Sequence, residues 1–130
     1  MRSTANTPVI LLGGALCSPR LWDRVIQDLV SAGHPASRFI SLPTSTFING
    51  HTHTSMNSAV LQFLSTLNSI VPSNRKFAVV GLSMGGYVAL TAGGICPHRI
   101  SGLALINSQC RPDSKQIKAG VRVWVSLCRS

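Results

Sequence analysis

Acidic residues are scarce in this chain of 130 residues, which has three aspartates and no glutamate against 12 lysines and arginines. The resulting formal charge of +9 raises the question of a nucleic-acid or anionic-membrane partner. Such a surface gathers its basic residues on one face, ideally beside aromatic residues that stack on bases. Here the basic residues are scattered and aromatic residues make up only 5%. We therefore do not expect nucleic acid to be the partner.

Long apolar runs are also missing. None approaches the roughly 18 residues that a membrane-spanning helix requires, and the stretch 9–17 is interrupted by Gly13 and Gly14. A strand followed by a glycine turn explains that stretch better than a signal peptide. The four cysteines are too far apart in the sequence for a metal or redox motif. We therefore expect a cytoplasmic protein with free thiols, no membrane span and no metal or other cofactor.

What the chain does contain is the composition and pattern of one folded domain. Apolar residues make up 45% of it, and its length suits a single core. Apolar runs rich in β-branched residues predict strands at 7–12, 39–42, 76–80 and 100–106. Apolar positions that recur every three or four residues predict helices over 18–33, 55–71 and 84–94, the first ending at Gly33. The fold class is therefore α/β, with a mostly parallel sheet and helices on both faces.

One short motif carries chemistry: Gly81-Leu82-Ser83-Met84-Gly85, between the third predicted strand and the next helix. Small residues two before and two after Ser83 let the strand and helix backbones approach closely, which holds the hydroxyl clear of the surface. A base can take its proton there, and the N–H of Met84 can point at a developing oxyanion. A chain with 11 glycines contains such a pattern by chance often enough that a turn that only packs remains the alternative.

With this motif and this order of elements, residues 7–112 resemble the α/β-hydrolase superfamily. The resemblance rests on the turn Gly13-Gly14-Ala15, the Ser83 motif, Pro97-His98-Arg99-Ile100 and Asn107-Ser108. It implies the N-terminal, nucleophile-containing part of that fold, with Ser83 as nucleophile and Ala15 as the second oxyanion N–H. Gly13 stands where the family usually has histidine, and an ordinary tight turn is the alternative for this loop.

The partners of an acyl-transferring serine are hard to find in the sequence. Such a serine needs a base within hydrogen-bond reach, usually oriented by a carboxylate. The family order is serine, acid, histidine, whereas after Ser83 the only histidine is His98 and the only acid is Asp113. We expect His98 in a solvated turn at the opposite end of the sheet. Asp113 is a candidate acid, although a charged loop residue is the plainer interpretation, as it is for His51 and His53.

We expect two parts in the chain. Residues 1–114 form the N-terminal portion of an α/β-hydrolase domain, and residues 115–130 form a tail of uncertain structure whose apolar residues alternate as in a strand. A complete domain of this family is longer, so we expect a truncated or frame-shifted product. Half a sheet would also expose an apolar strand edge after Ile106 and promote self-association.

The sequence thus predicts a serine hydrolase of the α/β-hydrolase type that acts on ester or related acyl bonds of a small molecule. It is expected to be impaired, because the acid and the histidine are not found in the family order. The alternative is a non-catalytic fragment that binds an acyl ligand or a protein partner. An acyltransferase, a lyase or a cofactor-free haloperoxidase on the same scaffold stays open, since a fold does not decide the reaction.

Overall fold

The computed structural model describes residues 7–14, 17–44, 56–107 and 124–127. Its strands are β1 (Val9–Leu12), β2 (Phe39–Leu42), β3 (Phe77–Leu82), β4 (Ile100–Ile106) and β5 (Trp124–Leu127). Its α-helices are α1 (Asp23–Ser31), α3 (Met56–Asn68) and α4 (Met84–Ile95), and the 3-10 helices are η2 (Pro19–Trp22), η3 (Ala36–Arg38) and η4 (Pro97–Arg99). Every predicted element is present, with ends that differ by at most a few residues. None of the helices in these ranges has the length and hydrophobicity to span a membrane.

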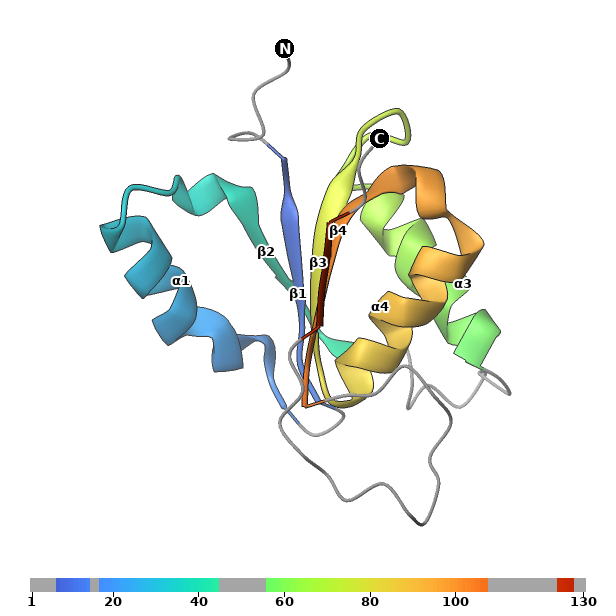
Figure 1. The fold of residues 1–130 in the computed structure, drawn as a ribbon, viewed down its shortest axis with the longest axis horizontal. Coiled ribbons are helices and arrows are strands. Elements are labelled where there is room, and N and C mark those ends of the chain that lie inside the picture. The colour runs from blue at the N-terminus through green and yellow to red at the C-terminus, as the bar shows by residue number, and fades with distance from the viewer. Residues whose placement is uncertain (1–6, 15–16, 45–55, 108–123, 128–130) are drawn as a thin grey trace.

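The strands form one sheet in the order β2-β1-β3-β4-β5, in which β2, β1, β3 and β4 run parallel. Figure 1 shows the sheet nearly edge on, with α1 on one face and α3 and α4 on the other. Parallel neighbours need crossover connections, and here helices provide them on both sides of the sheet. The predicted α/β class and the mostly parallel sheet are confirmed.

β5 joins the tail of the chain to the same sheet. It runs antiparallel to β4 and pairs with residues 102–105. The alternating pattern of the tail predicts such a strand. The expectation of an open β4 edge is wrong along residues 102–105, because β5 pairs with them. The backbone groups of β5 supply the hydrogen-bond partners that the β4 edge would otherwise lack. Self-association of the chain stays a prediction.

The two faces of the sheet are covered unequally. Toward α3 and α4, strand and helix residues form the buried core, which includes Ile10, Leu12, Val60, Phe63, Leu67, Phe77, Val79, Val88 and Leu105. Toward α1, the alternate residues Ala78, Val80 and Leu82 of β3 are only half-buried. Successive strand residues point to opposite faces of the sheet, so the alternation in burial shows that the α1 face is less well covered than the other. α1 itself contributes no buried residue.

α1 ends at the glycine that the sequence predicts for it. Gly33 has a φ of 103°, its N–H donates to the Val30 carbonyl at 3.0 Å, and the His34 N–H donates to the Leu29 carbonyl at 3.1 Å. This pair of bonds satisfies carbonyls that the helix end would otherwise leave open. Glycine suits the position because its φ is strained for a residue with a side chain.

Candidate active site

The carboxyl ends of β1 and β3 meet where the order of the strands reverses. The chain passes from β1 to β2 on one side of β1, and it then returns to β3 on the other side. In open α/β sheets, ligands bind outside the carboxyl ends of the strands at such a point. β1 is followed there by Gly13 and Gly14, and β3 is followed by Ser83. The topology therefore brings together the turn and the serine that the sequence analysis singled out.

Ser83 links β3 to α4 in a strained conformation. Its φ is 52° and its ψ is −115°, a region that is costly for a residue with a Cβ. Its N–H donates to the Ile106 carbonyl at 2.9 Å, and its own carbonyl accepts from the Gly86 N–H at 2.9 Å. These two bonds tie the turn to the end of β4 and to the first turn of α4. Although held on both sides, the residue is exposed.

The glycines that flank Ser83 are required by backbone packing. A Cβ on Gly81 would lie 2.5 Å from the Gly85 carbonyl oxygen, and one on Gly85 would clash with the Leu12 carbonyl and lie 2.7 Å from the Gly13 oxygen. Separations this short are far inside van der Waals contact. β1, β3 and the start of α4 thus meet backbone to backbone around Ser83, which is the close approach predicted from the motif.

The glycine turn after β1 lies against Ser83. A Cβ on Gly14 would be 3.9 Å from the Ser83 Cβ and 3.5 Å from the Cys17 Sγ. The Cys17 N–H donates to the Gly14 carbonyl at 3.1 Å, so this carbonyl is directed toward Cys17. Ala15, the predicted second oxyanion donor, lies outside the described residues, and its role stays a prediction.

Met84 is the first residue of α4, as the motif predicts. The first amides of a helix have no acceptor within it, and the aligned peptide dipoles place partial positive charge at this end. The side chain of Ser83, at the cap position, makes no capping bond to these amides. The oxyanion role of the Met84 N–H stays a prediction that this position favours.

Both described histidines lie at the far end of the sheet from Ser83. His98 is exposed in η4, which leads into the amino end of β4, so its predicted place in a solvated turn is confirmed. His34 follows α1, and its ring packs edge-on against Phe39 at the start of β2, with 6.3 Å between the centroids. The other candidates for base and acid, His51, His53 and Asp113, lie outside the described residues.

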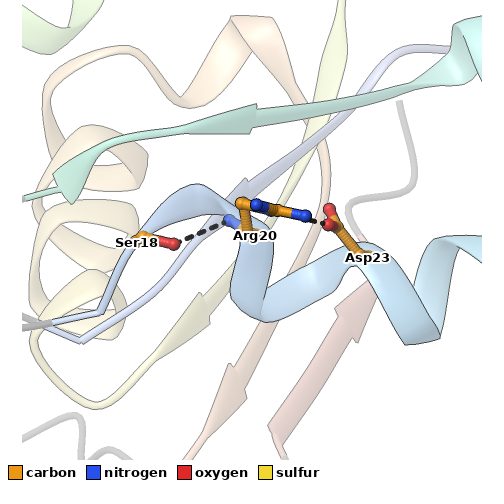
Figure 2. Close-up of polar contacts among 3 residues, drawn as sticks. All are labelled: Ser18, Arg20 and Asp23. Carbon is orange, nitrogen blue, oxygen red and sulfur yellow. Dashed lines mark hydrogen bonds and ion pairs between the residues drawn. The ribbon is translucent and has the colours of Figure 1, made fainter.

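Both described carboxylates belong to α1, and each pairs with an arginine three or four residues before it, in η2 for Asp23 and in α1 for Asp28. Arg20 Nε lies 3.4 Å from Asp23, and Arg24 Nε lies 3.6 Å from Asp28. Figure 2 shows the first pair, together with the Arg20 backbone N–H that donates to Ser18 Oγ at 3.2 Å. The side chains are mostly exposed, so each pair adds little stability. Among the residues with assigned positions, no group of three or more His, Cys, Asp or Glu could hold a metal ion.

Two features beside the serine were not predicted from the sequence. Asn107, directly after β4, has a φ of 50°. Trp22 in η2 is 5% exposed, and its buried Nε1 has no hydrogen-bond partner among the described residues. The sequence carries a signal only for Asn107, because asparagine tolerates positive φ better than most residues. For Trp22 the periodicity predicts no more than an apolar helix position.

No protein-family model matches the sequence, and no curated protein matches it. Solved structures do match the fold. A probable hydrolytic enzyme from Pseudomonas aeruginosa superimposes with a TM-score of 0.63 at 21% identity, over 82% of this chain and 34% of that one. An α/β-hydrolase from the metagenome of lagoon sediments at Mar Chica, Morocco, gives a TM-score of 0.59 at 20% identity, over 80% of this chain and 45% of that one. The thioesterase domain of the curacin biosynthetic pathway gives a TM-score of 0.58 at 20% identity, over 87% of this chain and 42% of that domain.

These likenesses establish the fold. The chain has part of the α/β-hydrolase fold, and it spans less than half the length of each of these three proteins. The predicted resemblance is therefore confirmed at the level of the fold.

Proposed function

We propose that this chain is the nucleophile-bearing part of a serine hydrolase that acts on ester or related acyl bonds of small molecules. The observation that carries the proposal is the positive φ of Ser83, between two glycines that lie in backbone contact with their surroundings. A turn that only packs would be more stable with glycine at this position, because a side chain there costs about 1 kcal/mol or more. A strained, exposed serine at the ligand-binding edge of the sheet is typical of a nucleophile.

In the proposed reaction, the Ser83 hydroxyl attacks the carbonyl carbon of the acyl bond while a base takes its proton. The carbonyl oxygen becomes an oxyanion, which accepts hydrogen bonds from the N–H groups of Met84 and Ala15. Collapse of this intermediate expels the leaving alcohol or thiol with a proton and leaves an acyl group on Ser83. Water then hydrolyses the acyl-enzyme by the same steps.

The hydrogen bond from Cys17 to the Gly14 carbonyl supports the second oxyanion donor. In a trans peptide the N–H points opposite to the carbonyl. Because Cys17 holds the Gly14 carbonyl, we expect the amide that follows Gly14 to face away from Cys17. The Ser83 Cβ lies 3.9 Å from the position that a Cβ on Gly14 would take. A donor in this turn would therefore be close to the reacting atoms.

The described histidines, His34 and His98, do not supply a base at the carboxyl edge of the sheet, where Ser83 lies. A serine without a base reacts slowly, so we propose low activity unless a histidine comes from outside the described residues. The names of two similar structures, a probable hydrolytic enzyme and a thioesterase domain, favour acyl-bond chemistry over other reactions of this fold.

A second candidate function is a non-catalytic fragment that binds an acyl ligand or a protein partner. The half-buried apolar residues on the α1 face of the sheet favour it, since parallel sheets usually have both faces covered. This candidate does not require Ser83 to react, which separates it from the first.

The test is the reaction of the purified chain with a fluorophosphonate and with p-nitrophenyl acetate. We expect covalent labelling at Ser83, found by peptide mapping, and a slow hydrolysis that Ser83→Ala abolishes. Ser31→Ala, at the exposed end of α1, is the matched control and should change neither reaction. Hydrolysis that is equal in the wild type and in Ser83→Ala, without labelling at Ser83, would reject the hydrolase and favour the second candidate.

A further inference from the structure

The indole N–H of Trp22 is buried and has no partner in the part of the chain that the structure describes. Trp22 is 5% exposed, and no described residue accepts a hydrogen bond from its Nε1. Folded proteins pair nearly all such donors, because an unmade hydrogen bond in the interior loses the partner that water would have provided. An unpaired donor beside a candidate active site therefore needs a reason.

This donor faces the glycine turn. Nε1 lies 3.8 Å from the position that a Cβ on Gly13 would take. The Gly13 carbonyl oxygen points elsewhere: it lies 2.7 Å from the position of a Cβ on Gly85, at the start of α4. The Trp22 N–H is thus close to Gly13, whereas the Gly13 carbonyl oxygen is turned toward Gly85.

The peptide between Gly13 and Gly14 lies beyond the last register pair of β1. The β1 ladder ends at Leu12, whose partners are Leu42 and Gly81. Glycine populates both signs of φ, so no Cβ opposes the rotation of a peptide flanked by two glycines. Since the carbonyl and the N–H of a trans peptide point in opposite directions, one rotation moves both groups.

We propose that Trp22 is a positioning residue, which holds the Gly13 carbonyl in a second orientation and thereby adds the Gly14 N–H to those of Met84 and Ala15 as a donor to an oxyanion on Ser83. In this orientation the Gly13 carbonyl accepts from Trp22 Nε1. The Gly14 N–H turns toward α4 and Ser83, whose Cβ is 3.9 Å from the Cβ position of Gly14. The inference rests on the proposed function, because only a negative charge at Ser83 selects this orientation over the other.

The experiment removes the N–H and keeps the shape of the side chain. Trp22 is replaced by 3-benzothienylalanine, which has the same bicyclic form and no N–H, and Trp22→Phe is made in parallel. We expect fluorophosphonate labelling of Ser83 to become about tenfold slower in the benzothienyl variant, the effect of one hydrogen bond. The thermal midpoint should not fall, since no described residue pairs with the donor before the reaction. Ser41→Ala is the matched control: its buried Oγ also has no partner in the described ranges, but it lies within β2, and labelling should stay within about twofold.

A spectroscopic measurement reads the hydrogen bond directly. We expect the indole ¹H resonance of Trp22 to move downfield when Ser83 of the wild-type chain is phosphonylated, with Trp124 as the internal reference. Equal labelling rates with and without the N–H, or an indole resonance that does not move, would overturn the inference while leaving Ser83 as the nucleophile. Failure of the wild-type chain to label at Ser83 would overturn the proposed function and the role of Trp22 together.

Discussion

At the amino end of the sheet each nitrogen of the buried Arg99 side chain donates a hydrogen bond. At the carboxyl end, by contrast, several buried polar groups have no partner among the described residues. Arg99 is 8% exposed and donates to the carbonyls of Pro72 and Arg75, at 3.0 Å and 3.2–3.3 Å, and to the side-chain oxygen of Asn68. Its guanidinium also lies 5.1 Å from the centre of the Phe77 ring. One side chain therefore joins the end of α3, the loop before β3 and the start of β4.

The carboxyl end has the opposite character. Ser83 and Asn107 both have positive φ. Thr44 follows β2 and is 1% exposed. Within the residues that the structure describes, the buried Trp22 N–H and the buried Thr44 hydroxyl have no hydrogen-bond partner. Strain and unpaired polar groups reduce stability, and they persist where the reaction or the ligand needs them. The contrast indicates that Arg99 stabilises the amino end, and it agrees with the proposal that the active site lies at the carboxyl end.

The largest effect should come from adding a methyl group where the backbones meet. We expect Gly85→Ala to destabilise the chain by about 4 kcal/mol or to prevent folding, because the new Cβ overlaps the β1 carbonyls. Gly94→Ala, in the same helix, has open space and should gain about 0.5–1 kcal/mol. Chemical denaturation measures both variants. Equal stabilities would contradict the backbone contact around Ser83.

The next effect tests the paired end of the sheet. Arg99→Met keeps the apolar stem but removes every donor, so we expect a loss of about 3 kcal/mol as the acceptors around it become unpaired. Arg99→Lys should recover part of this, since an ammonium group cannot reach all the acceptors that the planar guanidinium reaches. Urea titration of the three proteins gives the order. A neutral Arg99→Met would show that this end does not stabilise the fold.

A smaller effect of opposite sign is expected at the strained end. Ser83→Gly should raise the free energy of unfolding by about 1 kcal/mol, because glycine adopts positive φ without strain. Ser83→Ala keeps the Cβ and should leave stability nearly unchanged, and both variants should lose fluorophosphonate labelling. Thermal unfolding of the pair measures the difference. If glycine gives no gain over alanine, strain at Ser83 is not a cost in this fold.

The smallest effect concerns the buried thiol at the amino end. Burial raises the pKa of Cys96, and the charge of Arg99 opposes this in part. The folded chain therefore holds the neutral thiol to higher pH than the unfolded chain does. Its stabilising contribution is complete below the unfolded thiol pKa, ordinarily about 8.5, and is lost as pH rises through the folded value. We expect stability to decline less between pH 8 and pH 10 in Cys96→Ala than in the wild type; equal slopes would contradict the raised pKa.

Much of the fold, and the centre of the candidate site, could be predicted from local sequence. The roles of Gly33, Gly81 and Gly85 follow from what a Cβ can and cannot do at a helix end or a tight turn, so no distant contact is needed to infer them. The pairing of β5 with β4 instead joins segments about twenty residues apart, and its register depends on contacts that periodicity does not encode. The expectation of an open β4 edge failed for that reason.

The sequence by itself determined the order of strands and helices, the close approach around Ser83 and the place of the serine between β3 and α4. These depend on the side-chain period, on β-branching and on the absence of a Cβ, all properties of a few consecutive residues. Only the tertiary structure decided that Arg99 finds its acceptors at the amino end and that α1 leaves its face of the sheet half-covered. It also decided that the Trp22 N–H, beside the glycine turn, has no partner among the described residues. A hydrogen bond depends on where a partner lies in space, and that partner comes from a distant part of the chain.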